Sequence, residues 1–144
     1  MVKILFVCHG NICRSPMAEF VMKDMAAKWG KSHLFEIASA AVSREELGNP
    51  VYPPARRELA KHGIDCTGKT ARQVTTADFD HYDRIYYMDS SNAWYLKRML
   101  PTDPDKIRPL LSRDVADPWY TGDFTQTWND VVEGCEKIME EFCK

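Results

Sequence analysis

The sequence predicts an α/β fold in which a single domain, residues 1–144, holds a doubly wound sheet of four parallel strands with helices on both faces. The first observation is the continuous apolar run at residues 3–8, which is typical of a strand buried on both sides. The second is the alternation of strand-like and helix-like segments along the chain. The third is a length that suits one domain, with no internal repeat, linker or low-complexity segment.

The first helix is expected shortly after the strand Lys3–Cys8. Ser15 is a plausible N-cap, because Pro16 follows it where helices favour proline. Gly30 is the expected end of this helix, and Phe35–Ala40 is the expected second strand. Between the cap and the end, one face carries apolar residues at helical spacing: Ala18, Val21, Met22, Met25 and Trp29.

The middle of the chain contains a loop and two short helices. Residues 47–54, "LGNPVYPP", have the composition of a loop. The charged segment Ala55–His62 is expected to be helical and to stop at Gly63. Thr75 and Asp78 have the spacing of a capping box, which predicts the start of another short helix.

The last elements complete the sheet. Arg84–Asp89 and Lys106–Leu111 are the third and fourth expected strands, with a helix at Ser91–Leu100 between them. The final helix has the clearest periodicity, an apolar stripe opposite acidic residues: Phe124, Trp128, Val131, Val132, Cys135, Ile138, Met139 and Phe142. We expect a flavodoxin-like strand order with a ligand at the carboxyl ends of the strands, where Cys8 lies.

Composition and charge disfavour several classes of partner. A net charge of −2 gives no electrostatic reason to expect nucleic acid. The apolar run near the start is too short to span a membrane, and no cleavage site follows it. Five cysteines are an odd number without the spacing of a small disulfide scaffold, which favours a reducing compartment. We therefore expect a cytoplasmic protein that binds neither nucleic acid nor membrane. Separately, we expect a monomer.

The segment "CHGNICRS", Cys8–Ser15, has the residue types of an anion-binding loop. A turn from a strand into a helix aims successive backbone N–H groups inward at the positive end of the helix. Gly10 and Asn11 tolerate the left-handed backbone of such a turn, and Arg14 offers a planar fork for two phosphate oxygens. A cysteine at the base of this loop experiences the same positive field, which favours the nucleophilic thiolate. Ser15 can hydrogen-bond this thiolate.

The segment "VCHGNICRSPMAE" resembles the active-site loop of the low-molecular-weight protein-tyrosine phosphatases, whose pattern is C-x-x-x-x-x-R-S near the N-terminus. The resemblance continues through "ASAAVS", "LGNP", "ARQVTTADF", "YMDSSN" and "DPWY", and so covers most of the chain. It implies a hydrolase of phosphotyrosine in proteins and of small aryl phosphates, with no metal and no cofactor. Inorganic phosphate is then a product and an inhibitor.

The resemblance also implies roles for individual residues. Cys8 attacks phosphorus and forms a cysteinyl-phosphate, while Arg14 and the backbone N–H groups of the loop hold the phosphate oxygens. Asp117, in the late "DPWY" segment, protonates the phenolate leaving group and then activates water, and Ser15 eases thiolate departure. The residues expected to bind phosphate or support the loop are His9, Gly10, Asn11, Ile12, Cys13 and Ser15.

By the same resemblance, Trp119 and Tyr120 form one wall of a slot for an aromatic ring. The opposite rim departs from the pattern, because animal members often have an aromatic residue near the position of Glu45. Glu45 is retained as a wall residue. The alternative is that Glu45 and Glu46 begin a solvated helix, with Ser43 as its cap.

Two further positions concern the loop and the substrate. Many members carry a histidine near Lys69 that steadies the loop asparagine. Lys69 either replaces it as a donor or faces solvent, and we favour solvent. Relatives directed at phosphoarginine tend to have threonine at the position of Ile12, so the isoleucine favours phosphotyrosine.

A second phosphate-loop pattern occurs at Gly63–Thr70, where "GIDCTGKT" matches G-x-x-x-x-G-K-[ST]. That motif must follow a strand, whereas the preceding "ARRELAKH" has helical composition. We therefore reject ATP or GTP binding.

Cysteine spacing bears on the remaining alternatives. Cys13 follows Cys8 closely enough for a reversible protective disulfide, unless loop geometry forbids it. The pair lacks partners for a zinc site. One class of arsenate reductase shares this loop but needs two more cysteines after mid-chain, and residues 67–134 contain none. A non-catalytic phosphate sensor needs Arg14 but not both Cys8 and Asp117, so their joint presence favours an enzyme.

Overall fold

The computed structural model describes residues 1–143 and has four parallel strands in one sheet, in the order β2-β1-β3-β4. The strands are β1 (Val2–Cys8), β2 (Phe35–Ala41), β3 (Arg84–Tyr87) and β4 (Ile107–Pro109). The central strand β1 pairs along its whole length with β2, so that Cys8 is opposite Ala41. This arrangement confirms the predicted fold class and strand order.

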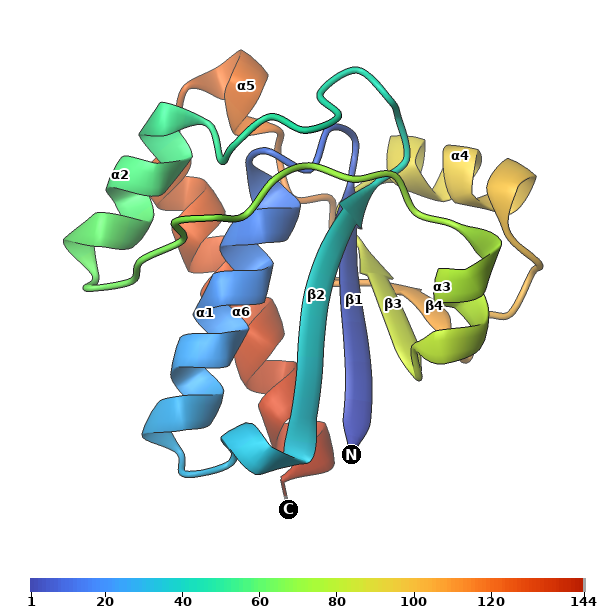
Figure 1. Cartoon of the computed structure of the whole chain (residues 1–144), viewed down its shortest axis with the longest axis horizontal. Coiled ribbons are helices and arrows are strands. Elements are labelled where there is room, and N and C mark those ends of the chain that lie inside the picture. Colours follow the sequence, from blue (N-terminus) through green and yellow to red (C-terminus); the bar gives the residue numbers. More distant parts are fainter. Residues whose placement is uncertain (144) are drawn as a thin grey trace.

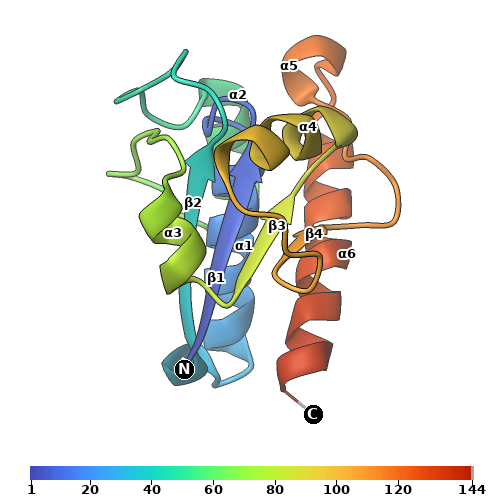
Figure 2. The ribbon, with the colours of Figure 1, turned by 90° about the vertical axis from the view of Figure 1, so that its right-hand side faces the viewer.

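Helices cover both faces of the sheet, as Figures 1 and 2 show. One face carries α1 (Arg14–Lys28), α2 (Pro53–Lys61) and α6 (Phe124–Phe142). The other face carries α3 (Thr76–His81) and α4 (Ser90–Met99). A single 3-10 turn, η1 (Ser32–Leu34), precedes β2, and the short α5 (Pro118–Thr121) lies beyond the carboxyl ends of the strands.

Strand β1 explains why its sequence is a continuous apolar run. Side chains alternate between the two faces of a strand. Ile4 and Phe6 accordingly pack in the core beneath α1 and α6, while Leu5 and Val7 pack beneath α3 and α4. All four side chains are fully buried, so no position in this stretch of the strand is left for a polar residue.

The start of α1 differs from the prediction. The helix begins at Arg14, with Cys13 as the N-cap residue, and Ser15 makes no capping hydrogen bond. The Ser15 hydroxyl instead lies 3.0 Å from the Cys8 sulfur. The predicted N-cap was therefore wrong, because a tertiary contact occupies the side chain that local preference assigned to the helix end.

Other element boundaries shift by a few residues. Helix α2 begins at Pro53, inside the predicted loop, because proline is well suited to a first helical turn. Strand β3 ends before Met88, because the N–H of Met88 donates to the side chain of Asn92 and not to a neighbouring strand. Strand β4 begins after Lys106, whose N–H turns back to Asp103. The predicted capping box of Thr75 at the start of α3 is confirmed.

The segment "GIDCTGKT" follows helix α2 and not a strand. Gly63 has a φ of +75°, and its N–H donates to the carbonyl of Ala60, as expected of the residue after a helix end. The strand that a nucleotide loop requires is therefore missing at this point of the chain.

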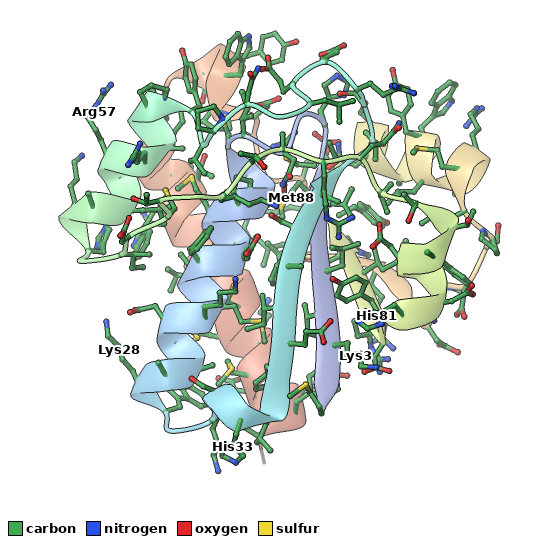
Figure 3. The ribbon with its side chains drawn as sticks, in the orientation of Figure 1. Lys3, Lys28, His33, Arg57, His81 and Met88 are labelled. Carbon is green, nitrogen blue, oxygen red and sulfur yellow. The ribbon has the colours of Figure 1, made fainter. Side chains whose placement is uncertain are left out.

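Within residues 1–143, no helix has the length and apolar character needed to cross a bilayer. The same part of the chain has no cluster of three or more His, Cys, Asp or Glu side chains arranged to hold a metal ion. Figure 3 shows Lys28 and His33 at the end of the molecule opposite the carboxyl ends of the strands.

Candidate active site

The predicted anion loop connects β1 to α1 at the carboxyl end of the central strand (Figure 1). It is fixed from the side of β2. The carbonyls of Cys8 and His9 accept hydrogen bonds from the N–H groups of Val42 and Ser43, at 3.0 and 3.1 Å. The loop is therefore held at its entry by backbone contacts that do not depend on a ligand.

The sulfur of Cys8 lies at the base of this loop among hydrogen-bond donors. The N–H groups of Asn11 and Ser15 approach it at 3.3 and 3.4 Å, and the Ser15 hydroxyl is 3.0 Å away. Cys8 is 3% exposed, so bulk water does not compete strongly for these contacts. The Cys8 sulfur is therefore held in place by backbone and side-chain contacts from the loop and from the start of α1.

Asn11 holds the turn in a conformation that few residues adopt. Its φ is +61°, the one positive value for a non-glycine residue among residues 1–143, which confirms the predicted left-handed geometry. The side-chain amide donates to Ser15 Oγ at 2.7 Å and to Ser39 Oγ at 3.0 Å. Its oxygen accepts from the N–H of Arg72 at 3.2 Å.

A buried polar network supports Asn11 from behind. The Ser39 hydroxyl donates to Glu19 Oε1 at 2.6 Å, and Lys69 Nζ donates to the Ser39 carbonyl at 2.9 Å. Lys69 also lies 3.6 Å from Glu19, and its side chain is 12% exposed. Burial lowers the pKa of Lys69, and the charge of Glu19 opposes this shift. Our preference for a solvent-facing Lys69 was wrong, because Glu19 and Ser39 draw the ammonium inward.

Arg14 is 2% exposed and is held by acceptors on three sides. Its Nη1 donates to Asp89 Oδ2 at 2.7 Å and to the Val115 carbonyl at 2.8 Å, and its Nη2 donates to Asp117 Oδ2 at 3.3 Å. Burial alone lowers the pKa of the guanidinium, but the negative groups Cys8, Asp89 and Asp117 outweigh it and raise the pKa.

Two donors of this guanidinium remain for a ligand. Arginine carries five N–H groups. Within residues 1–143, the hydrogen bonds of Arg14 occupy both N–H groups of Nη1 and one of Nη2. The Nε–H and the second Nη2–H form one edge of the planar group, the geometry that binds two oxygens of a phosphate. That Arg14 holds phosphate through this edge stays a prediction.

Asp117, the predicted acid, lies at the start of α5. It is the N-cap of α5, where its Oδ1 accepts from the N–H of Trp119 at 3.1 Å, while Oδ2 faces Arg14. One carboxylate oxygen is therefore fixed by the helix and the other points toward the anion loop. Asp114, the other acid of the segment, contacts Ser90 and does not line the pocket.

These groups meet at a pocket of about 140 Å³. Cys8, Arg14 and Asp117 line it together, as predicted, and so do the predicted wall residues. The complete lining is Cys8, His9, Gly10, Ile12, Cys13, Arg14, Glu45, Glu46, Asp117, Trp119 and Tyr120. The supporting residues Asn11 and Ser15 do not line it, because they face the buried network behind the loop.

The rim of the pocket is aromatic on one side and acidic on the other. Trp119 and Tyr120 are 50% and 84% exposed, and both line the pocket. Opposite them, Glu45 Oε2 lies 3.0 Å from Nε2 of His9. The alternative of a capped helix at this rim was wrong, because Ser43 donates its hydroxyl to the His9 carbonyl and residues 45–48 form turns.

Cys13 lies beside Cys8 in the pocket lining but in a different environment. Burial raises the pKa of the Cys13 thiol, and the negative charges of Cys8 and Asp117 raise it further. Cys13 is therefore held as the neutral thiol, a poor nucleophile. Both cysteines are free, and a disulfide between them stays a prediction.

The sequence reasoning missed two groups of residues. Asp89 was predicted only as the last residue of the third strand, yet it is the main partner of Arg14. Its place at the carboxyl end of the third predicted strand was a usable signal, because carboxyl ends of neighbouring parallel strands converge. Ser39 and Glu19 gave no local signal, because their contacts to Asn11 and Lys69 join distant parts of the chain.

The fold and the site define a doubly wound α/β domain with a cysteine at the base of an anion loop and a carboxylic acid across the pocket. The sequence model of the family "Low molecular weight phosphotyrosine protein phosphatase" matches residues 3–144. The chain belongs to this family of phosphatases.

Known proteins agree with this assignment. The chain is 38% identical to the low molecular weight protein-tyrosine-phosphatase YfkJ of Bacillus subtilis, covering 100% of this chain and 97% of YfkJ. The crystal structure of YfkJ superposes with a TM-score of 0.95 over 99% of this chain and 95% of that one. The human low molecular weight phosphotyrosine protein phosphatase is 36% identical, with 96% and 94% covered. DARP, a drosophila arginine phosphatase, is 27% identical, with a TM-score of 0.89 and 99% of both chains covered.

Proposed function

We propose that this phosphatase hydrolyses phosphotyrosine in proteins through a cysteinyl-phosphate on Cys8, with Asp117 as general acid and base. The observation that carries the proposal is the shared pocket, where Arg14 Nη2 lies 3.3 Å from Asp117 Oδ2 and Cys8 forms part of the same lining. A nucleophile, an anion-binding group and an acid thus face one volume.

Phosphate binding is proposed to use the unoccupied edge of Arg14 and the N–H groups of the loop. The phosphoryl group bound there faces Asp117, which supplies the proton for the first step. Asp89 keeps its hydrogen bond to Nη1 throughout, so the guanidinium does not rotate when the ligand enters.

In the first step, the Cys8 thiolate forms a bond to phosphorus and the bond from phosphorus to the aryl oxygen breaks. The leaving phenolate takes a proton from Asp117. In the second step, Asp117 takes a proton from water as the water oxygen attacks phosphorus. The S–P bond breaks, and the Ser15 hydroxyl, 3.0 Å from Cys8 Sγ, stabilises the departing thiolate. Inorganic phosphate is the product and a competitive inhibitor.

The aromatic entrance supports an aryl phosphate as the substrate. Trp119 and Tyr120 offer ring faces to a phenyl group, and Ile12 offers an apolar surface beside them. The similarity to DARP keeps phosphoarginine as a second candidate, and Ile12 argues for phosphotyrosine. Relative rates on phosphotyrosine and phosphoarginine peptides of the same sequence distinguish the two.

The test of the mechanism is hydrolysis of p-nitrophenyl phosphate by wild type, Cys8→Ser and Asp117→Ala, with a chelator present. Loss of activity in Cys8→Ser and a large decrease in kcat for Asp117→Ala are expected. Activity that survives Cys8→Ser, or that vanishes with chelator alone, would contradict the mechanism. Phosphate binding by a wild type that shows no turnover would instead support a phosphate sensor.

We further propose that the protein acts as a monomer in a reducing cytoplasm on phosphoprotein substrates, without nucleic acid or membrane as partner. The support is the odd number of cysteines, all free within residues 1–143, and the small net charge of −2. Sedimentation analysis under reducing conditions tests the monomer.

A further inference from the structure

A second hollow of about 240 Å³ adjoins the catalytic pocket. Ile12, Glu46 and Trp119 line both, so the two are separated only by side chains that they share. A ligand that fills the catalytic pocket therefore extends directly past, or into, the second hollow. No step of the phosphatase mechanism uses this space.

The floor of the second hollow is apolar and preformed. Val51 is 4% exposed, and the ring of Tyr52 packs against Trp119 and Phe124 with centroids 4.8 and 6.2 Å apart. The N–H of Tyr52 donates to the Ile12 carbonyl at 2.9 Å. This bond ties the floor to the anion loop, so the hollow and the catalytic pocket keep a fixed relative position.

The charge of the hollow restricts its occupant. Among its lining residues the one charged side chain is Glu46, whose Oε2 accepts from Asn49 Nδ2 at 2.6 Å. Cγ of Glu46 lies 3.3 Å from where a Cβ on Gly10 would be, so Glu46 is packed onto the anion loop. A carboxylate at the boundary disfavours an acidic occupant, and the floor offers no group to pair with a buried charge.

We propose that this hollow receives an apolar side chain of the substrate polypeptide, from a residue within two positions of the phosphotyrosine. The proposal rests on the proposed function, because the phosphotyrosine fixes where the polypeptide begins. Pockets for whole small molecules have volumes of about 300–1,000 Å³, so a hollow of 240 Å³ suits one side chain. An extended chain advances about 3.3 Å per residue, which brings a neighbouring side chain over the shared wall.

The test is a set of phosphotyrosine peptides in which each position from −2 to +2 carries Leu, Phe, Ala, Lys or Asp in turn. We expect one of these positions to prefer Leu or Phe over Ala by about five- to twentyfold in kcat/KM, from partial burial of the side chain. Asp at that position is expected to be poorer than Ala. This series uses the wild-type protein and does not depend on the folding of a variant.

Two matched variants locate the preference in the structure. Asn49 is exposed and lines only the second hollow, so Asn49→Trp fills the hollow from its edge. Thr102→Trp makes a comparable change in a separate hollow between α4 and β4. Asn49→Trp is expected to reduce the Leu-to-Ala ratio to within about twofold of one, whereas Thr102→Trp keeps the wild-type ratio.

Hydrolysis of p-nitrophenyl phosphate separates the two proposals, because this substrate has no flanking residue. Equal rates across the peptide series, a preference for Lys over Leu, or a preference retained in Asn49→Trp would overturn the inference while aryl phosphate hydrolysis continues. Absence of Cys8-dependent hydrolysis of both peptides and aryl phosphate would overturn the proposed function, and the inference with it.

Discussion

Arg14 Nη1 lies 2.7 Å from Asp89 Oδ2, in an ion pair that joins the first residue of α1 to the residue that caps α4. The Arg14 side chain is 2% exposed and that of Asp89 is 18% exposed. This pair orients the guanidinium before any ligand enters, so less ordering remains to be done on binding. We therefore infer that Asp89 is a positioning residue, which acts through Arg14 and not on phosphate directly.

Replacement of Asp89 is the first prediction. Asp89→Asn keeps an oxygen that accepts from the N–H of Asn92 at the start of α4 but removes the charge opposite Arg14. We expect kcat/KM for p-nitrophenyl phosphate to fall by about 10- to 100-fold and the inhibition constant of inorganic phosphate to rise. Asp114→Asn, which alters an acid outside the pocket, serves as the control. Unchanged phosphate inhibition in Asp89→Asn would remove its positioning role.

The second prediction concerns the buried ammonium behind the loop. Lys69→Met removes the donor to the Ser39 carbonyl and the charge near Glu19. We expect a loss of about 1–3 kcal/mol in the free energy of unfolding and a several-fold decrease in kcat, because the Ser39 contact to Asn11 loosens.

Lys28→Met is the matched control for this change. Lys28 forms a surface pair with Asp24 and lies at the far end of the molecule in Figure 3. Exposed pairs of this kind contribute about 0.2–0.5 kcal/mol on a helix. Urea denaturation and steady-state kinetics of both variants make the comparison, and equal behaviour of the two would count against a special role for Lys69.

Asp78 provides a prediction about pH. Burial alone raises the pKa of Asp78, but the hydrogen bonds from Arg72 and from the N–H of Thr75 outweigh it and lower the pKa below its ordinary value. A lowered pKa in the folded state gives stability that is present at neutral pH and is lost as the pH falls through that pKa. The stability difference between wild type and Asp78→Asn should therefore be about 1–3 kcal/mol at pH 7 and should shrink below about pH 4.

Chemical denaturation at a series of pH values measures this difference. Asp80 is exposed on the same helix, so Asp80→Asn is expected to leave the free energy of unfolding almost unchanged at every pH. If the free energies of unfolding of wild type and Asp78→Asn differed by the same amount from pH 7 to pH 3, the carboxylate charge would not be the cause of the stability difference.

Gly134 gives a prediction about packing, in which replacement of a helix glycine by alanine lowers the stability. Glycine to alanine in a helix interior ordinarily stabilises by up to about 1 kcal/mol. A Cβ at Gly134 of α6 would, however, lie 2.4 and 2.5 Å from Cγ and Cδ1 of Leu110. We expect Gly134→Ala to destabilise by about 1–3 kcal/mol.

A double-mutant cycle with Leu110→Ala checks the cause of this destabilisation. The double variant should lose less free energy of unfolding than the two single variants together, because the new methyl group occupies space that Leu110→Ala vacates. Thermal or urea denaturation of the four proteins gives the coupling free energy. Additive costs would assign the effect to the helix backbone.

Much of the fold was predictable because local pattern and tertiary structure agree. The apolar run of β1 reflects two covered faces, and the spacing of Thr75 and Asp78 reflects a real cap. Ser15 shows where agreement ends. Its hydroxyl faces Cys8, and the start of α1 has no side-chain cap. The preference of serine for a helix N-cap is therefore overridden at the candidate active site.

The candidate site was predictable where chemistry and spacing coincide and not where distant residues meet. Cys8 and Arg14 lie at the two ends of one short turn from a strand into a helix. The turn therefore directs both side chains toward the same pocket. Lys69 and Glu19 are separated along the chain, and composition offers 21 acidic residues as possible partners. Only the packing of α1 against β2 and the segment after α2 selects this pair.

The short helix α5 holds both Asp117 and the aromatic residues of the pocket entrance, but their placement has different causes. The position of Asp117 is set by Arg14 and by the N–H of Trp119, neither of which depends on the identity of the side chains at 119 and 120. Those side chains are largely exposed. The entrance can therefore diverge between relatives, and different phosphoproteins can be selected, while the proposed proton donor Asp117 keeps its place. In this scaffold the choice of substrate is free to evolve without disturbing the chemistry.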